Sequence, residues 1–257
     1  MATLMKEKNR KVIKLFENNR LMRVINLSNL NGIPIKFLQE LEKQDYLFYQ
    51  NEFLENLLDI DSINDIIVKI NEFCESNTII GFHYTRVIPE EISKKGLICR
   101  TGKELRRTFM SNWGYLFTDE EKIKITNTWD SYFSMHSQQG RDNILFFNFT
   151  TYALYNGGAQ RLLQNYGGEQ VYMPIESIDC ISEKIKNIGI PLILKCKLNP
   201  KDLNTFCENP WGNIAVSTYH RLVNPEAHQD DQDGYQSVNV DPQNIEIIKF
   251  YDKQYNY

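Results

Sequence analysis

The hydrophobic pattern of the chain changes near residue 76. Over residues 6–74, apolar side chains recur at spacings of three and four residues, which is the period of an amphipathic helix. Asp61 or Ser62 provides an N-cap for one such run, which continues through Ile63, Ile66, Ile67 and Ile70. The pattern predicts a helical N-terminal region over residues 1–76.

From residue 77 to residue 257 the pattern is one of short β-rich runs. They cover residues 78–85, 144–149, 169–173, 191–198, 237–240 and 244–251. The stretch "PEEISKKGL" (89–97) predicts a short helix, because Pro89 suits a first turn and Gly96 follows the end. Short strands with few intervening helices predict an α+β fold with a mainly antiparallel sheet.

Composition indicates an ordinary soluble protein. Of the 257 residues, 42% are hydrophobic and 24% are charged, which is enough apolar material for a packed core. The five cysteines form no CxxC pair, so we expect reduced thiols and a cytoplasmic location. No apolar run approaches the roughly 20 residues that span a bilayer, and the N-terminus has no signal-peptide core, so no membrane partner is expected.

Charge is unevenly distributed along the chain. The formal net charge of −4 excludes a molecule that coats nucleic acid over its whole surface. Residues 1–40 hold eight Lys or Arg against three Asp or Glu, whereas residues 41–75 hold two against nine. The basic segment permits RNA or DNA as a partner and equally an acidic protein, while solvated helix faces also explain both segments.

Several common catalytic motifs do not occur in the sequence. The chain has no GxGxxG after a strand, no GxxxxGK[ST], no HExxH and no GxSxG. His136, His220 and His228 show no metal-ligand spacing. We therefore expect neither a Rossmann or P-loop nucleotide site nor a bound metal.

The stretch "GFHYTRVIPEEISKKGL" (81–97) places a histidine in a predicted strand, followed by polar residues, a short helix and "GL". It resembles the first motif of ADP-ribosyltransferases of the diphtheria-toxin and poly-ADP-ribose-polymerase type, and the start of DarT-like toxin domains. The resemblance implies that His83 binds a ribose hydroxyl of NAD and that the Tyr84 backbone holds the nicotinamide amide. Thr85 and Arg86 would face the dinucleotide. The alternative is a histidine that only packs in the core or at a sheet edge.

The stretch "ILFFNFTTYALYNGGAQRL" (144–162) resembles the next part of these families, where a strand leads into a helix with an aromatic wall. The resemblance implies that Tyr152 or Tyr155 stacks on the nicotinamide ring, whose positive charge suits an aromatic face. Phe149, at the strand end, is a further expected NAD contact. The alternative is that these tyrosines serve packing alone.

The stretch "NYGGEQVYMP" (165–174) places Glu169 after two glycines, at the start of a predicted apolar strand. It resembles the strand that carries the catalytic glutamate of ribosyltransferases. A fixed carboxylate there would stabilise an oxocarbenium-like ribose, and Gly168 would lie against NAD. The alternative is an exposed glutamate after a turn.

A second residue competes for the catalytic position of Glu169. "GYQSVNVDPQNIEIIKFY" (234–251) resembles the last two strands of the same families. By order along the chain, Gln236 then occupies the position of the glutamate. A glutamine supplies no negative charge, so activity would fall or move to other acceptors. Both assignments stay open at this point.

The resemblance implies an ADP-ribosyltransferase-like, split antiparallel sheet around an NAD cleft over residues 77–257. It further implies an enzyme that cleaves NAD+ as a substrate, without a metal, and transfers ADP-ribose to RNA, DNA or protein. A toxin of a toxin–antitoxin or anti-phage system, with an antitoxin or chaperone partner, would fit. The alternatives are an NAD+ glycohydrolase and a non-catalytic module that acts through its N-terminal helices.

Overall fold

The computed structural model describes residues 23–135, 141–229 and 232–250. The strands are β1 (Val24–Ile25), β2 (Thr78–Val87), β3 (Leu145–Asn148), β4 (Ile190–Leu198), β5 (Asn204–Thr205), β6 (Asp233–Gln236) and β7 (Ile245–Lys249). The α-helices are α2 (Ile35–Glu42), α3 (Asp45–Gln50), α4 (Asp61–Glu75), α5 (Pro89–Lys95), α6 (Gly102–Trp113), α7 (Asp119–Met135), α8 (Gln160–Gln164), α9 (Glu169–Tyr172), α10 (Asp179–Lys186) and α11 (Pro210–Val223). The predicted helical residues before Arg23, His136 and the end of the predicted strand 244–251 lie outside the described residues.

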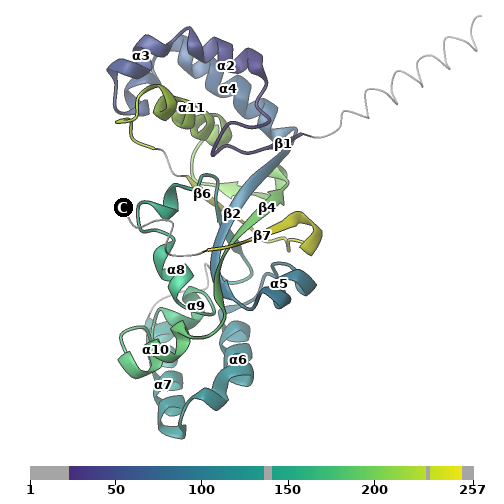
Figure 1. Cartoon of the computed structure of the whole chain (residues 1–257), viewed down its shortest axis with the longest axis vertical. Coiled ribbons are helices and arrows are strands. Elements are labelled where there is room, and N and C mark those ends of the chain that lie inside the picture. The colour runs from purple at the N-terminus through teal and green to yellow at the C-terminus, as the bar shows by residue number, and fades with distance from the viewer. Residues whose placement is uncertain (1–22, 136–140, 230–231, 251–257) are drawn as a thin grey trace, which may run out of the picture.

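The strands form one mixed sheet of seven strands, and the predicted α+β class is confirmed (Figure 1). The strand order is β5-β6-β3-β2-β4-β7, and β1 pairs with β2. All pairs except β1 with β2 are antiparallel. The longest ladder joins β2 and β4 from Ile79↔Leu198 to Val87↔Ile190. Strands were predicted correctly at β2, β3, β4 and β7.

Two of the predicted strands are wrong. Residues 169–173 fall in the helix α9, because Gly167 and Gly168, with φ of 92° and 72°, turn the chain before Glu169. In the last part of the chain, the strand β6 covers residues 233–236 instead of 237–240. Val240 contributes only an isolated bridge to Leu97.

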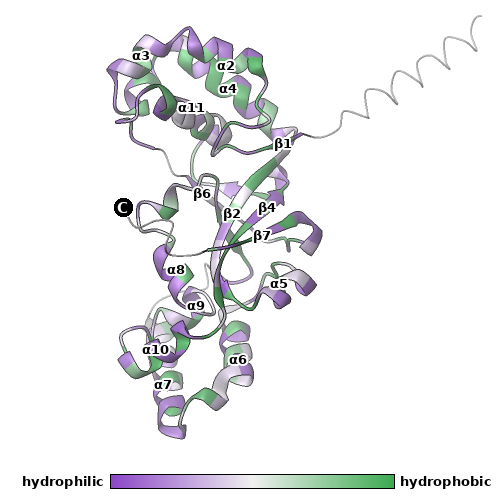
Figure 2. Cartoon of the chain, viewed as in Figure 1, coloured by the Kyte–Doolittle hydropathy of each residue, from purple (hydrophilic) through white to green (hydrophobic). Residues whose placement is uncertain are grey.

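The N-terminal helices α2, α3 and α4 agree with the prediction over residues 35–75, and with α11 they form what we call the N-terminal lobe. Gly212 of α11 lies so close to the backbone of α4 that a Cβ there would come within 2.1 Å of the Ile67 carbonyl oxygen. The Trp211 amide donates to Asn71 Oδ1 at 3.1 Å. One hydrophobic core runs from this lobe into the sheet, so the change of pattern near residue 76 does not interrupt the core. Hydrophobic residues alternate with hydrophilic ones in the helices of this lobe (Figure 2).

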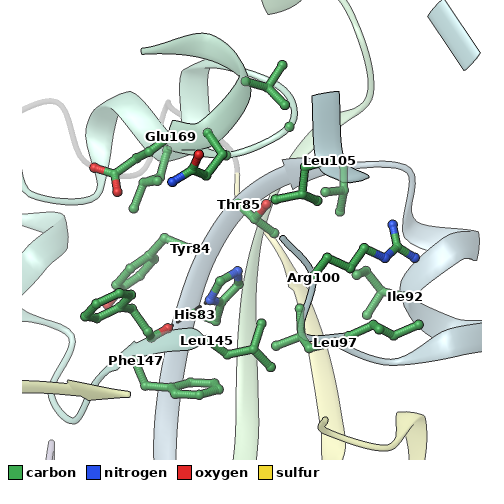
Figure 3. A pocket seen from close by; sticks show the side chains of 18 of the residues that line it. His83, Tyr84, Thr85, Ile92, Leu97, Arg100, Leu105, Leu145, Phe147 and Glu169 are labelled. Atoms are coloured by element: carbon green, nitrogen blue, oxygen red, sulfur yellow. Dashed lines mark hydrogen bonds between the residues drawn. The ribbon is translucent and has the colours of Figure 1, made fainter. Parts of the chain in front are cut away.

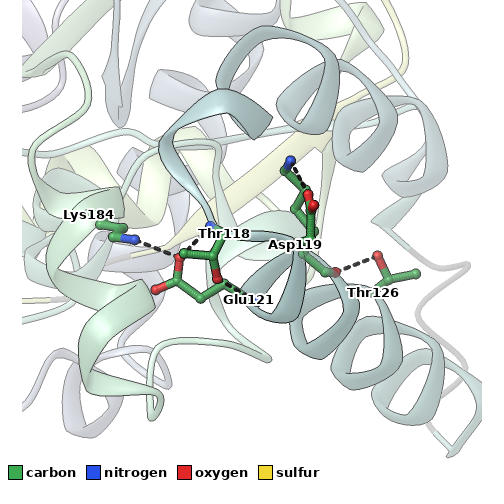
Figure 4. Close-up of polar contacts among 6 residues, drawn as sticks. Thr118, Asp119, Glu121, Thr126 and Lys184 are labelled. Carbon is green, nitrogen blue, oxygen red and sulfur yellow. Dashed lines mark hydrogen bonds and ion pairs between the residues drawn. The ribbon is translucent and has the colours of Figure 1, made fainter.

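The helices α6, α7, α9 and α10 form a second group, which we call the insertion lobe, because α6 and α7 lie between β2 and β3 in the chain. Its buried aromatic and aliphatic residues form a separate core cluster that includes Phe109, Trp129 and Tyr172. Polar contacts also join its helices (Figure 4). Glu121 accepts from the Thr118 amide at 2.8 Å and from Lys184 Nζ at 2.6 Å, which connects α7 to α10.

Candidate functional site

A cavity of about 770 Å³ lies between the sheet and the insertion lobe. Its walls come from β2, residues 91–100, α6, β3 and residues 166–171. The volume is within the range of about 300–1,000 Å³ that is usual for small-molecule sites. This cavity brings together residues that are more than 80 positions apart in the sequence.

His83 lies in the wall of this cavity (Figure 3). Its Nδ1 lies 2.9 Å from the carbonyl oxygen of Phe146. A carbonyl can only accept, so Nδ1 carries the hydrogen and a neutral ring can accept only through Nε2. Burial lowers the pKa of His83, and the bond to Phe146 opposes this shift only in part. The imidazole is therefore held neutral, in one tautomer, and in one orientation.

The opening beside His83 results from a separation of two strands. β2 pairs with β4 over nine residues but with β3 only through Phe82↔Asn148. Beyond that pair, the Phe146 carbonyl accepts from the His83 ring. A side chain thus occupies a position that a ladder hydrogen bond would fill in a continuous sheet. This separation gives a ligand access to the edges of both strands.

Of the three residues that follow His83 in β2, two line the cavity and one does not. Thr85, which is buried, and Tyr84 both line the cavity. The Tyr84 hydroxyl donates to the Thr150 carbonyl at 3.4 Å. Arg86 does not line the cavity, because its guanidinium donates to the carbonyls of Ile188 at 2.9 Å and Leu163 at 3.5 Å. Thr85 and Tyr84 thus lie at the cavity, whereas Arg86, which was expected to face the dinucleotide, bonds to backbone carbonyls outside it.

Glu169 and Gly168 line the cavity on the side of the insertion lobe, as expected for a carboxylate that faces a ligand (Figure 3). Glu169 begins α9 and forms an ion pair with Arg141, which lines the same cavity. About one third of the Glu169 side chain is exposed (32%). The ion pair with the Arg141 guanidinium orients this carboxylate.

Three aromatic residues that were predicted to contact NAD do not line the cavity. Tyr155 is 62% exposed, and Tyr152 lies under the guanidinium of Arg221 at 5.8 Å. Phe149 is fully buried against Trp211, with ring centroids 4.7 Å apart. None of these three rings is placed as a wall of the cavity.

Gln236 is likewise away from the cavity. It is buried in β6, and its Nε2 donates to the Val238 carbonyl at 2.6 Å. Of the two residues that compete for the acidic position, only Glu169 lines the cavity together with His83.

Sequence reasoning missed Arg100, Arg141, Phe109 and Tyr166, all of which line the cavity. Tyr166 is an aromatic wall in place of the predicted tyrosines, and burial raises its pKa, so its hydroxyl stays protonated. One feature of the sequence could have drawn attention to Arg100. It directly precedes the capping box of Thr101 and Glu104, which fixes the start of α6.

Comparison with models of known protein families, with curated proteins and with solved structures finds no match to this chain. Among the described residues, no helix is long and apolar enough to cross a lipid bilayer. In the same part of the chain, no three His, Cys, Asp or Glu side chains gather as a metal site.

Proposed function

We propose that the protein is an ADP-ribosyltransferase that cleaves NAD+ and transfers ADP-ribose to a macromolecule. The observation that carries this proposal is the presence of His83 and Glu169 in the walls of one cavity of about 770 Å³. These are the two residues that the resemblance to ribosyltransferases assigns to the reacting ribose. The size of the cavity suits a dinucleotide.

In this proposal His83 positions the ribose. Its Nδ1 is engaged with the Phe146 carbonyl, so Nε2 accepts a hydrogen bond from a ribose hydroxyl. The lowered pKa keeps the ring neutral, and a neutral ring adds no positive charge beside a sugar that becomes cationic in the transition state. The Thr85 side chain and the Tyr84 backbone, on the same strand, line the adjoining wall.

Glu169 supplies the negative charge. When the bond between nicotinamide and ribose breaks, its electron pair leaves with the nicotinamide, and positive charge develops on the ribose. A carboxylate fixed at the wall stabilises that charge and orients the acceptor. The nucleophilic atom of the acceptor then bonds to C1′ of the ribose, and its proton passes to water. The nicotinamide then lies against the aromatic side of the cavity, where Tyr166 and Phe109 replace Tyr152 and Tyr155 as the proposed wall.

The acceptor, and with it a role as a toxin in a toxin–antitoxin or anti-phage system, belongs to the same proposal. Support for a nucleic-acid acceptor is limited to the basic composition of residues 1–40. The test must therefore include RNA, DNA and protein together, so that the macromolecule that carries the label identifies the acceptor.

The test is incubation of the full chain with NAD labelled in its adenine ring, in the presence of cellular RNA, DNA and protein. We expect free nicotinamide and label on one macromolecule, and a decrease of at least about a hundredfold for Glu169→Gln. Glu176→Gln is a matched control, since Glu176 has the same exposed fraction of 32%, pairs with Arg161 and lies outside the cavity. It should keep the activity.

Each other result has a definite meaning. Nicotinamide release with label only in small molecules would identify a glycohydrolase that uses water as the acceptor. Loss of turnover in a folded Gln236→Ala variant, with Glu169→Gln active, would assign the proposed catalytic role of Glu169 to Gln236. A folded wild type that gives no heat with NAD in calorimetry, with no change for His83→Ala, would overturn the proposal and favour a non-catalytic binding module.

A further inference from the structure

Arg100 is a cation in the cavity wall, and the Glu104 carboxylate interacts with it through space without forming an ion pair. Among the described residues its guanidinium forms no hydrogen bond or ion pair, although the residue is half-buried. Three other arginines near the cavity differ, because Arg141 pairs with Glu169, Arg86 donates to backbone carbonyls and Arg106 donates to Gln170. A guanidinium in a cavity wall that makes no hydrogen bond has all its N–H donors available, and it is stabilised when an anion binds them.

The backbone around Arg100 is fixed on both sides. Leu97 and Val240 exchange two backbone hydrogen bonds of 2.9 Å, and the Cys99 amide donates to Asn239 Oδ1 at 2.8 Å. The Arg100 carbonyl accepts from the Asn143 amide at 3.0 Å. The capping box of α6 begins at the next residue. Little backbone entropy is therefore lost when this arginine binds a ligand.

We infer that Arg100 forms an anion-binding subsite for a phosphoryl or pyrophosphate group at the α5 side of the cavity. A planar guanidinium binds two phosphate oxygens at once, which an ammonium cannot do. Lys95 adds a second positive charge to the lining, and Glu91 on α5 opposes it. In the view of Figure 3, Arg100 lies beside Ile92 and Leu97, and Glu169 lies on the other side of His83.

This arrangement gives the ligand a direction. The pyrophosphate lies toward Arg100, the ribose is at His83, and the bond that breaks is on the side of Glu169. The identity of the anion as the pyrophosphate of NAD rests on the proposed function. The subsite itself rests on the position of Arg100 and takes any nucleoside diphosphate of suitable size.

The experiment is calorimetric titration of the full chain with ADP, and separately with adenosine. Loss of hydrogen bonds to a charged group predicts that Arg100→Ala weakens ADP binding about ten- to a hundredfold. Adenosine, which lacks the anion, should bind both proteins equally. Arg100→Lys keeps the charge without the bidentate geometry and should lie between the two. Arg107→Ala, at an exposed position of α6 outside the cavity, should bind ADP like the wild type.

Three results would overturn the subsite: no binding of ADP to the wild type, an equal loss of adenosine and ADP affinity in Arg100→Ala, or unchanged ADP affinity in Arg100→Ala and Arg100→Lys. Thermal unfolding of each variant shows whether it is folded, and Arg100→Lys carries the comparison if Arg100→Ala is not. ADP binding that depends on Arg100 without NAD cleavage would leave the subsite standing and remove the transferase. NAD cleavage at an unchanged rate in Arg100→Ala, with unchanged ADP affinity, would remove the subsite and leave the transferase standing.

Discussion

The two helical lobes differ in how they are joined to the sheet. The N-terminal lobe shares one hydrophobic core with the sheet, so that Ile67 and Trp211 belong to the same cluster as Leu194. The insertion lobe has its own cluster, and it meets the sheet across the cavity. A close-packed core leaves no space for a ligand, whereas a boundary between two cores does. The candidate site therefore lies beside the insertion lobe.

The largest effect on the free energy of unfolding is expected for a substitution in the core of the insertion lobe. Trp129 is buried, packs edge-on against Phe109 at 5.9 Å and donates through Nε1 to the Val171 carbonyl at 2.9 Å. Trp129→Ala should lower the free energy of unfolding by about 3–5 kcal/mol. Hydrogen exchange should accelerate mainly in residues 102–135 and 169–188, because this core is separate. Equal acceleration in the N-terminal lobe would contradict the separation of the two cores.

A second change tests the shared core. Ile67 of α4 is 2% exposed. Ile67→Ala should destabilise the protein by about 2–5 kcal/mol in chemical unfolding. Exchange should accelerate in α4, α11 and β4 together, since one cluster includes residues of all three. Acceleration confined to α4 would show that the lobe and the sheet are independent.

A smaller effect is expected where α4 and α11 touch. A Cβ at Gly212 would come within 2.1 Å of the Ile67 carbonyl oxygen, so Gly212→Ala must push the two helices apart. We expect a loss of about 1–3 kcal/mol in the free energy of unfolding. Gly114→Ala is the control, because a Cβ there meets only the end of a Met110 side chain, at 4.0 Å. An equal loss in the free energy of unfolding for Gly114→Ala would show that the close contact between α4 and α11 does not explain the effect at Gly212.

The smallest effect concerns the polar contact between α7 and α10. The hydrogen bond from Lys184 is the main reason that the pKa of Glu121 is lowered. A carboxylate with a lowered pKa adds stability above its ordinary pKa, and that stability is lost as the pH falls through the lowered value. Lys184→Met should therefore be less stable than the wild type at neutral pH, with a difference that shrinks in acid.

The check is thermal unfolding across this pH range, together with a carboxyl titration by NMR in which the Glu121 pKa of the variant rises toward its ordinary value. Lys186→Met is the control, since its pair with Glu183 lies within one turn of α10 and more of both side chains is exposed. A pH-independent difference for Lys184→Met would assign its effect to packing instead of charge.

Sequence patterns correctly predicted the helices and strands whose signals lie within or directly beside their own residues. The helix α4 and the strands β2, β3, β4 and β7 are predicted from their apolar patterns, and the helix α5 is predicted from Pro89 at its start and Gly96 after its end. The error at residues 169–173 has a local cause as well. A short apolar run fits a strand or a buried helix, and two glycines before it fit a turn that precedes either element.

Hydrophobic patterning predicted an α+β chain, and the resemblance to ribosyltransferases implied catalytic or NAD-binding roles for ten residues, among them His83, Thr85 and Glu169. Only the tertiary structure decided that these three meet at one cavity, that Gln236, Tyr152 and Tyr155 do not, and that Arg100 and Tyr166 do. The physical reason is that periodicity reports which side of an element is buried. Which residues share a cavity depends on contacts between segments far apart in the chain, here the separation of β3 from β2 and the folding of the insertion lobe over it.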